Sequence, residues 1–136
     1  MHMYIKKIGH CCLIIKEGEA VFLTDPGAYI EDNSSITGID AILITHEHGD
    51  HFHIENLKKV LAANPEAKVI TNSAVGKLVQ AEKITPEIVE GNSTTEIKGI
   101  LIEAFDGKHE EIFDIIHFTF TLPTLWHFTR LFTKWN

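Results

Sequence analysis

The chain has 136 residues, a length that suits one domain with one hydrophobic core. It is 44% hydrophobic and 23% charged, and its net charge is −7 with all nine histidines neutral. This acidic balance argues against a general nucleic-acid binder, which needs a clustered Lys/Arg surface, so we expect no nucleic-acid partner.

The first part of the chain is predicted to form strands in succession. Residues 4–8 and 12–15 read as two extended segments, and a turn at Glu17-Gly18-Glu19 leads into a returning strand at 20–23. Asp25-Pro26-Gly27 ends that strand in a loop. The unbroken apolar run at residues 41–44 then predicts a strand that is buried on both faces.

From residue 54 onward the pattern alternates between helices and strands. Apolar residues at helical spacing predict a helix that begins near Ile54 and is stopped by Asn64-Pro65. A second helix is predicted after Ser73, whose hydroxyl can cap it. Further strands are predicted at residues 68–71, 88–89, 94–97, 100–105 and 118–122. This order indicates the α/β or α+β class, with a sheet that is covered by helices.

The last 22 residues differ in composition from the rest. Residues 115–136 contain no acidic residue and hold six of the twelve aromatic residues, whereas residues 1–114 carry a net charge of −9 (10 basic, 19 acidic). We therefore expect a boundary that separates 1–114 from an atypical aromatic tail at 115–136. The uncharged part of the tail is too short and too rich in threonine to predict a membrane span.

The cysteines and the N-terminus indicate the compartment. Cys11 and Cys12 are adjacent and so imply no disulfide framework, which suits a reducing environment. Residues 1–7 lead directly into a strand pattern without the apolar core of a signal peptide. We expect a cytoplasmic protein.

The segment THEHGDHFH, residues 45–53, concentrates metal-binding side chains directly after the 41–44 strand. Imidazole and carboxylate groups are ligands of zinc and similar ions. His46 and His48 are two residues apart, so an extended backbone points them the same way, and Gly49 permits a turn that brings in Asp50 and His51. This spacing predicts two neighbouring ions, one held by His46 and His48 and the other by Asp50 and His51. Neither Glu47 nor His53 is in phase with these ligands.

These residues also resemble a known superfamily. His46-x-His48-x-Asp50-His51 is similar to the HxHxDH signature of metallo-β-lactamase-fold proteins. In the same order along the chain, Gly9-His10-Cys11-Cys12 resembles the GHS-type opening of the lactonase-like, RNase-Z-like branch, 23–27 resembles the DPG motif, and 39–46 resembles the lead-in strand. The resemblance covers residues 3–113. It implies an αββα sandwich and a metal-dependent hydrolase that uses a metal-bound hydroxide against a lactone, ester or phosphoester bond of a small molecule.

The resemblance also suggests roles for residues outside the cluster. Asp25 would support the site, although Asp-Pro-Gly is equally ordinary turn chemistry. His10 would line the pocket, with a packed residue at a strand end as the alternative, and both cysteines would belong to the core. His109 would be the third ligand of the first ion, against the alternative of a surface-loop histidine. Asp50 would orient the attacking water, and the cofactor would be one or two Zn²⁺, with Mn²⁺ or Fe²⁺ as alternatives.

The chain departs from the family pattern after His109. The family's later Gly-Asp motif and final histidine, which complete the second metal site, are not visible in residues 110–136. This suggests a truncated family member, with the tail arising from truncation or a frameshift, and it puts activity in doubt. Two alternatives stay open: a non-catalytic metal-binding half-domain and a nuclease-like member, the latter disfavoured by the acidic charge. An uncovered sheet face would also favour a homo-oligomer.

Overall fold

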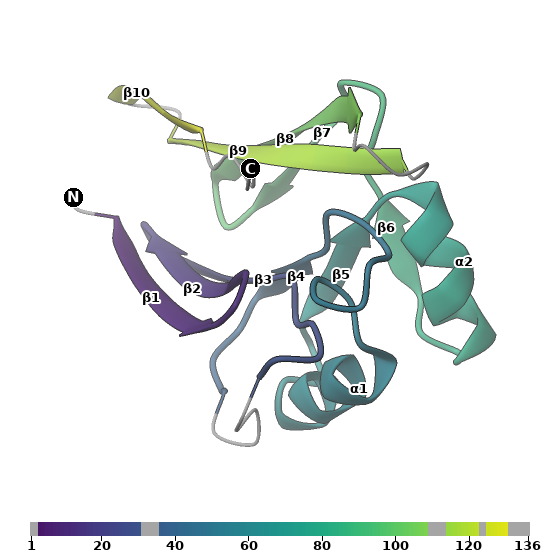
Figure 1. The fold of residues 1–136 in the computed structure, drawn as a ribbon. Coiled ribbons are helices and arrows are strands. Elements are labelled where there is room, and N and C mark those ends of the chain that lie inside the picture. The colour runs from purple at the N-terminus through teal and green to yellow at the C-terminus, as the bar shows by residue number, and fades with distance from the viewer. Residues whose placement is uncertain (1–2, 31–35, 109–113, 123–124, 131–136) are drawn as a thin grey trace.

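The computed structural model describes residues 3–30, 36–108, 114–122 and 125–130. Two β-sheets face each other, and both helices pack on the outer face of the first sheet (Figure 1). The strands are β1 Tyr4–Gly9, β2 Cys12–Glu17, β3 Ala20–Thr24, β4 Ala41–Leu43, β5 Lys68–Thr71, β6 Pro86–Ile88, β7 Thr94–Ile97, β8 Ile100–Lys108, β9 Asp114–Leu122 and β10 Leu125–Arg130. The helices are α1 Ile54–Ala63 and α2 Ser73–Ala81.

The first sheet has six strands in the order β1-β2-β3-β4-β5-β6. The pairs β1–β2 and β2–β3 are antiparallel hairpin partners, whereas β3–β4, β4–β5 and β5–β6 are parallel. Parallel pairing requires crossovers, and α1 and α2 supply two of them. The predicted α/β class with a helix-covered sheet is therefore confirmed.

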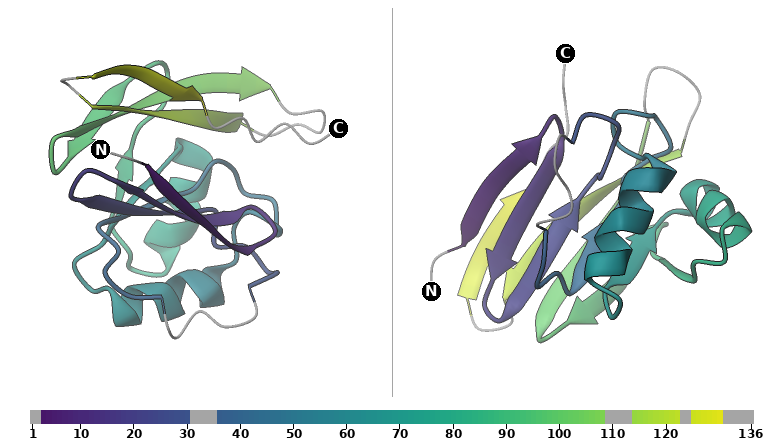
Figure 2. Two further views of the ribbon diagram at one scale, coloured as in Figure 1. Left: turned by 90° about the vertical axis from the view of Figure 1, so that its left-hand side faces the viewer. Right: turned by 90° about the horizontal axis from the view of Figure 1, so that it is seen from below.

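The second sheet has four antiparallel strands in the order β10-β9-β8-β7. β7 and β8 form a hairpin around Lys98 and Gly99, both at positive φ. The second sheet lies above the first sheet, as the left view of Figure 2 also shows. The described residues thus form three layers of the αββα sandwich: the helices, the first sheet and the second sheet. Within these residues no helix covers the outer face of the second sheet.

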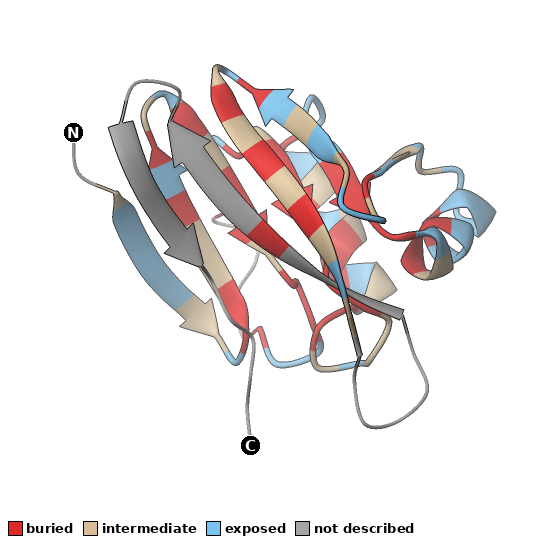
Figure 3. Cartoon of the chain, turned by 90° about the horizontal axis from the view of Figure 1, so that it is seen from above, coloured by how far each residue is buried: buried red, intermediate tan, exposed pale blue. Residues whose placement is uncertain are grey.

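Strand β4 shows why the core divides in two. All three of its residues are buried, as the sequence predicted. Ala41 and Leu43 point into the cluster between the two sheets, and Ile42 points into the cluster under the helices. This is the two-residue alternation of a strand that is buried on both faces. Buried residues in Figure 3 accordingly follow the inner strands, while β1 at the sheet edge is largely exposed.

Several predicted boundaries needed correction; the strand predicted at 118–122, for example, is β9 and begins at Asp114. The N-cap of α2 is Asn72, not Ser73, because Asn72 has an extended backbone and its side chain accepts from the Val75 N–H at 2.9 Å. Ser73 is the first helical residue, and its hydroxyl donates to the Glu90 carboxylate. The strand predicted at 88–89 is β6, which ends at Ile88, although the Val89 N–H still donates to Thr71.

Candidate metal centre

The histidine cluster occupies the loop that leaves β4 and enters α1. His46 is 1% exposed and His51 is 7% exposed, so both residues are buried within the loop. The His46 ring centroid lies 4.8 Å from that of His48 and 4.0 Å from that of His51. Three imidazoles from this short segment therefore converge on one region.

Asp25 is the carboxylate that organises this loop. It follows β3 with φ 36°, a left-handed backbone that aspartate tolerates better than most residues, and it is 1% exposed. Its Oδ1 accepts from the Thr45 N–H at 2.8 Å. Its Oδ2 accepts from the Thr45 hydroxyl at 2.9 Å and lies 2.7 Å from His51 Nδ1. A single buried side chain thus fixes residues at both ends of the loop.

These contacts define the orientation of two imidazoles. The Thr45 hydroxyl gives its one proton to Asp25, so its oxygen, 2.9 Å from His46 Nδ1, accepts the Nδ1 proton. His51 Nδ1 donates to Asp25 in the same way. In the neutral form of both rings, Nε2 is then the nitrogen that carries a lone pair. A histidine whose Nδ1–H is held by a carboxylate or hydroxyl is typical of metal ligation through Nε2, so the donor set suits a divalent ion.

Asp50 lies between two histidines. Its Oδ2 is 2.9 Å from His10 Nε2 and 3.5 Å from His51 Nε2. Burial raises the pKa of Asp50, but the His10 hydrogen bond and the charge of His51 outweigh it, so the pKa is lowered. Burial lowers the pKa of His51, but the hydrogen bond and charge of Asp25 and the charge of Asp50 reverse this, so the pKa is raised.

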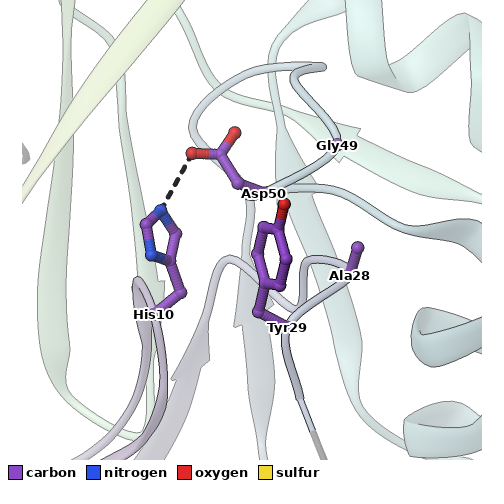
Figure 4. A pocket seen from close by; sticks show the side chains of 5 residues that line it. All are labelled: His10, Ala28, Tyr29, Gly49 and Asp50. Atoms are coloured by element: carbon purple, nitrogen blue, oxygen red, sulfur yellow. Dashed lines mark hydrogen bonds and ion pairs between the residues drawn. The ribbon is translucent and has the colours of Figure 1, made fainter.

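An open pocket lies beside this pair. Its volume is about 640 Å³, and it is lined by His10, Ala28, Tyr29, Gly49 and Asp50. Figure 4 shows Asp50 reaching towards the His10 ring, with Tyr29 standing beside them. The His10 and Tyr29 rings meet edge to face, with centroids 5.5 Å apart. A small molecule in this pocket would touch Asp50 and His10.

The adjacent cysteines have different surroundings. Cys12 is 1% exposed and packs in the apolar cluster beneath the first sheet, and burial raises its pKa to about 12. Cys11 faces the histidines, and burial together with the charges of Asp25 and Asp50 raises its pKa to about 11. Neither thiol is ionised near neutral pH in these surroundings, which disfavours a cysteine nucleophile.

The structure brings together six of the residues that the sequence indicated: His10, Asp25, His46, His48, Asp50 and His51. His109 lies outside the described residues, so its proposed ligand role stays a prediction. His53 is the N-cap of α1, with its side chain accepting from the Asn56 N–H, and it takes no part in the cluster. The ligand assignments themselves remain predictions.

Sequence reasoning did not anticipate the position of Cys11. His10, Cys11 and His51 place one potential ligand atom each within 4.8 Å of one another. The adjacency of His10 and Cys11 was visible, but which of two neighbouring cysteines faces the histidines depends on the turn geometry. His10 has φ 23°, and the β1–β2 register shifts at Lys7/Gly9. No periodic pattern encodes such a turn.

Comparison with known proteins gives the family. The family described as "Beta-lactamase superfamily domain" matches residues 4–128, which includes most of the tail. The chain is 40% identical over 67 residues to Protein Rv0786c of Mycobacterium tuberculosis, which covers 49% of this chain and 32% of that protein. It is 34% identical over 86 residues to a UPF0173 metal-dependent hydrolase of Aeropyrum pernix, which covers 59% of this chain and 34% of the relative. The chain thus spans about a third of the length of these relatives.

Solved structures share the fold. A Parabacteroides distasonis protein named as a candidate metal-dependent hydrolase superposes with a TM-score of 0.74 at 22% identity, over 88% of this chain and 56% of that one. YhfI of Bacillus subtilis, a metallo-beta-lactamase fold protein, superposes with a TM-score of 0.62 at 15% identity, over 85% and 52%. The site loop lies within the region matched by the family, and the chain therefore belongs to the beta-lactamase superfamily and has the metallo-β-lactamase fold.

Proposed function

We propose that the protein is a metal-dependent hydrolase that acts on a small-molecule lactone, ester or phosphoester. The observation that carries this proposal is the convergence of His46, His48 and His51, two of them oriented through Nδ1 by the Asp25–Thr45 pair. The description of the Aeropyrum pernix relative as a metal-dependent hydrolase supports the same reading. Zinc is the ion we propose, since it accepts imidazole and carboxylate ligands; Mn²⁺ and Fe²⁺ are the alternatives.

In this proposal His46 and His48 hold one ion, and Asp50 and His51 lie where they can hold a second. A divalent ion at this place would supply Lewis acidity and lower the pKa of water towards about 7. Asp25 keeps His51 in one tautomer and one orientation through the 2.7 Å contact to Nδ1. Asp50 would accept a hydrogen bond from a water molecule and orient it. The open pocket beside Asp50 would take the substrate.

Metal content tests this proposal directly. Protein dialysed against metal-free buffer is analysed for transition metals, and we expect at least about one ion per chain. His46→Ala/His48→Ala should lose that ion because both ligands are removed. His53→Ala is the matched control: it lies in the same motif but caps α1, so the ion should remain. Less than about a tenth of an equivalent in the parent protein would contradict the proposal.

Turnover tests the reaction class. A lactone, an aryl ester and an aryl phosphodiester are assayed with Zn²⁺ or Mn²⁺ added, with the double variant as the baseline. We expect weak metal-dependent hydrolysis of at least one of these substrates above that baseline. Metal bound at full stoichiometry without hydrolysis of any of the three would favour a non-catalytic metal-binding protein. A preference for the phosphodiester would favour the nuclease-like alternative.

A further inference from the structure

We infer that His10 and Cys11 are metal ligands that act with His51, which makes the second ion of the site a zinc held by nitrogen and sulfur. The inference rests on the proposed function, because it concerns the ion adjacent to the one at His46 and His48. It assigns ligands from the β1–β2 turn, well before the histidine motif in the chain.

The first observation is proximity. The potential ligand atoms of His10, Cys11 and His51 all lie within 4.8 Å of one another. Ligands around a zinc ion sit about 2.0–2.3 Å from it, so atoms at this mutual spacing can reach one ion after small side-chain movements. Cys11 and His51 are buried and His10 is exposed, so the position is enclosed on one side and open towards the pocket.

The second observation is the carboxylate between the two imidazoles. Asp50 Oδ2 lies 2.9 Å from His10 Nε2 and 3.5 Å from His51 Nε2. The Nε2 atoms of both rings therefore lie close to the same carboxylate oxygen. Two imidazoles and a thiol, with a carboxylate beside the imidazoles, form a donor set that suits a zinc ion.

The third observation is that the backbone holds His10 in an uncommon conformation. His10 has φ 23°, next to the register shift at Lys7/Gly9. A Cβ on Gly9 would lie 2.4 Å from the Tyr29 carbonyl oxygen, so the turn packs tightly against the segment that follows Asp25. Backbone strain of this kind persists where the surrounding structure enforces it, and it is common at functional sites. The turn thereby directs the two consecutive side chains of His10 and Cys11 towards His51.

A thiol ligand at Cys11 predicts a specific metal preference for the second site. Thiolate ligands favour zinc and cobalt over manganese and magnesium, which prefer oxygen. Binding would release the Cys11 proton to solvent and leave a thiolate on the ion. The second site should accordingly select Zn²⁺ or Co²⁺, whereas a site made only of Asp50 and His51 would not discriminate in this way.

Cobalt is the probe for the test, because a thiolate bound to Co²⁺ gives a charge-transfer absorption in the near ultraviolet that imidazole and carboxylate ligands do not give. The full chain is titrated with Co²⁺ while the spectrum and the bound metal are followed. We expect the band in the parent protein. Cys11→Ser should abolish the band. Cys11→Ser and His10→Ala should each lower the affinity for one of the two cobalt ions at least about tenfold. Cys12→Ser is the matched control and should keep the band, because Cys12 packs in the apolar cluster.

The outcomes separate this inference from the proposed function. Cobalt that binds without the band, and is lost in His46→Ala/His48→Ala, overturns the inference and leaves the proposed function standing. A band that persists in the double variant with unchanged total cobalt supports the inference and contradicts the proposed function. A band that survives in Cys11→Ser and disappears in Cys12→Ser overturns the inference. Absence of the band in the parent protein overturns the inference without any variant, so the test can fail even if a substitution impairs folding.

Discussion

Asp25 shows how one residue can connect the fold to the chemistry. Its carboxylate is 1% exposed and is shared by the Thr45 N–H, the Thr45 hydroxyl and His51 Nδ1. Its own N–H donates to the Leu43 carbonyl at 2.9 Å, which ties the end of β3 to β4. A buried carboxylate with three donors stabilises the loop, and its removal leaves those donors without an acceptor.

We therefore predict that Asp25→Ala lowers the free energy of unfolding by about 3 kcal/mol, because buried donors lose a charged acceptor. Urea denaturation of the metal-free protein measures this. Asp106→Ala is the control: this exposed carboxylate also accepts a backbone N–H, from Gly91 at 2.7 Å, and its loss should cost about 1 kcal/mol or less. Equal losses for the two variants would contradict the role given to Asp25.

At the scale of single residues, the sequence indicated which residues form the cluster better than it indicated which side chains contact each other. The signature of His46, His48, Asp50 and His51 suggested a cluster because their spacing is local, and the structure does bring their side chains together. The Asp25–Thr45 contact joins residues 20 positions apart through a positive-φ backbone, and no local pattern encodes it. For the same reason, Asp-Pro-Gly could be read equally well as turn chemistry or as site support.

At the scale of elements, the site depends on two loops that touch through their backbones. The loop after β3 meets the loop after β4 where Ala28 N–H donates to the Gly49 carbonyl at 2.8 Å and His53 N–H donates to the Pro26 carbonyl at 3.1 Å. A Cβ on Gly27 would lie 2.0 Å from the Asp50 carbonyl oxygen, so only glycine permits this approach. The sequence predicted both loops correctly, but it could not show that they meet, because the parallel order of β3 and β4 emerges only in the sheet.

We predict that Gly27→Ala lowers the free energy of unfolding by about 1–3 kcal/mol and weakens metal binding, because the added methyl group pushes the Asp50 backbone away from its place. Gly49→Ala is the matched control within the histidine motif, since a Cβ there would meet nothing within 4 Å. Thermal or urea unfolding, followed by Co²⁺ titration, compares the two. A Gly27→Ala protein with parental stability and affinity would show that the loops separate without consequence.

At the scale of the whole molecule, the two sheets are joined by one apolar cluster. It contains Phe22 from β3, Leu43 from β4 and Ile102 from β8, all 0% exposed, together with Phe118 from β9 at 5%. The sequence boundary at residue 114 rested on composition, which changes sharply there. Composition cannot reveal that β9 pairs with β8 along the register from Leu101↔Thr121 to Lys108↔Asp114, because such pairing is not local. The boundary itself stays a prediction.

If residues 114–122 belong to the same folding unit as the first sheet, removing the Phe118 side chain should destabilise the whole chain. We predict that Phe118→Ala lowers the free energy of unfolding by about 3–5 kcal/mol in one cooperative transition, since it leaves a cavity between the sheets. Ile5→Ala on β1 is the control; Ile5 is 45% exposed, so its truncation should cost about 1 kcal/mol or less. Urea unfolding is followed both by far-ultraviolet circular dichroism and by tryptophan fluorescence, since both tryptophans lie after residue 114. Two separate transitions, with only the fluorescence signal shifted by Phe118→Ala, would mean that the tail folds apart from the sheet that carries the candidate metal site.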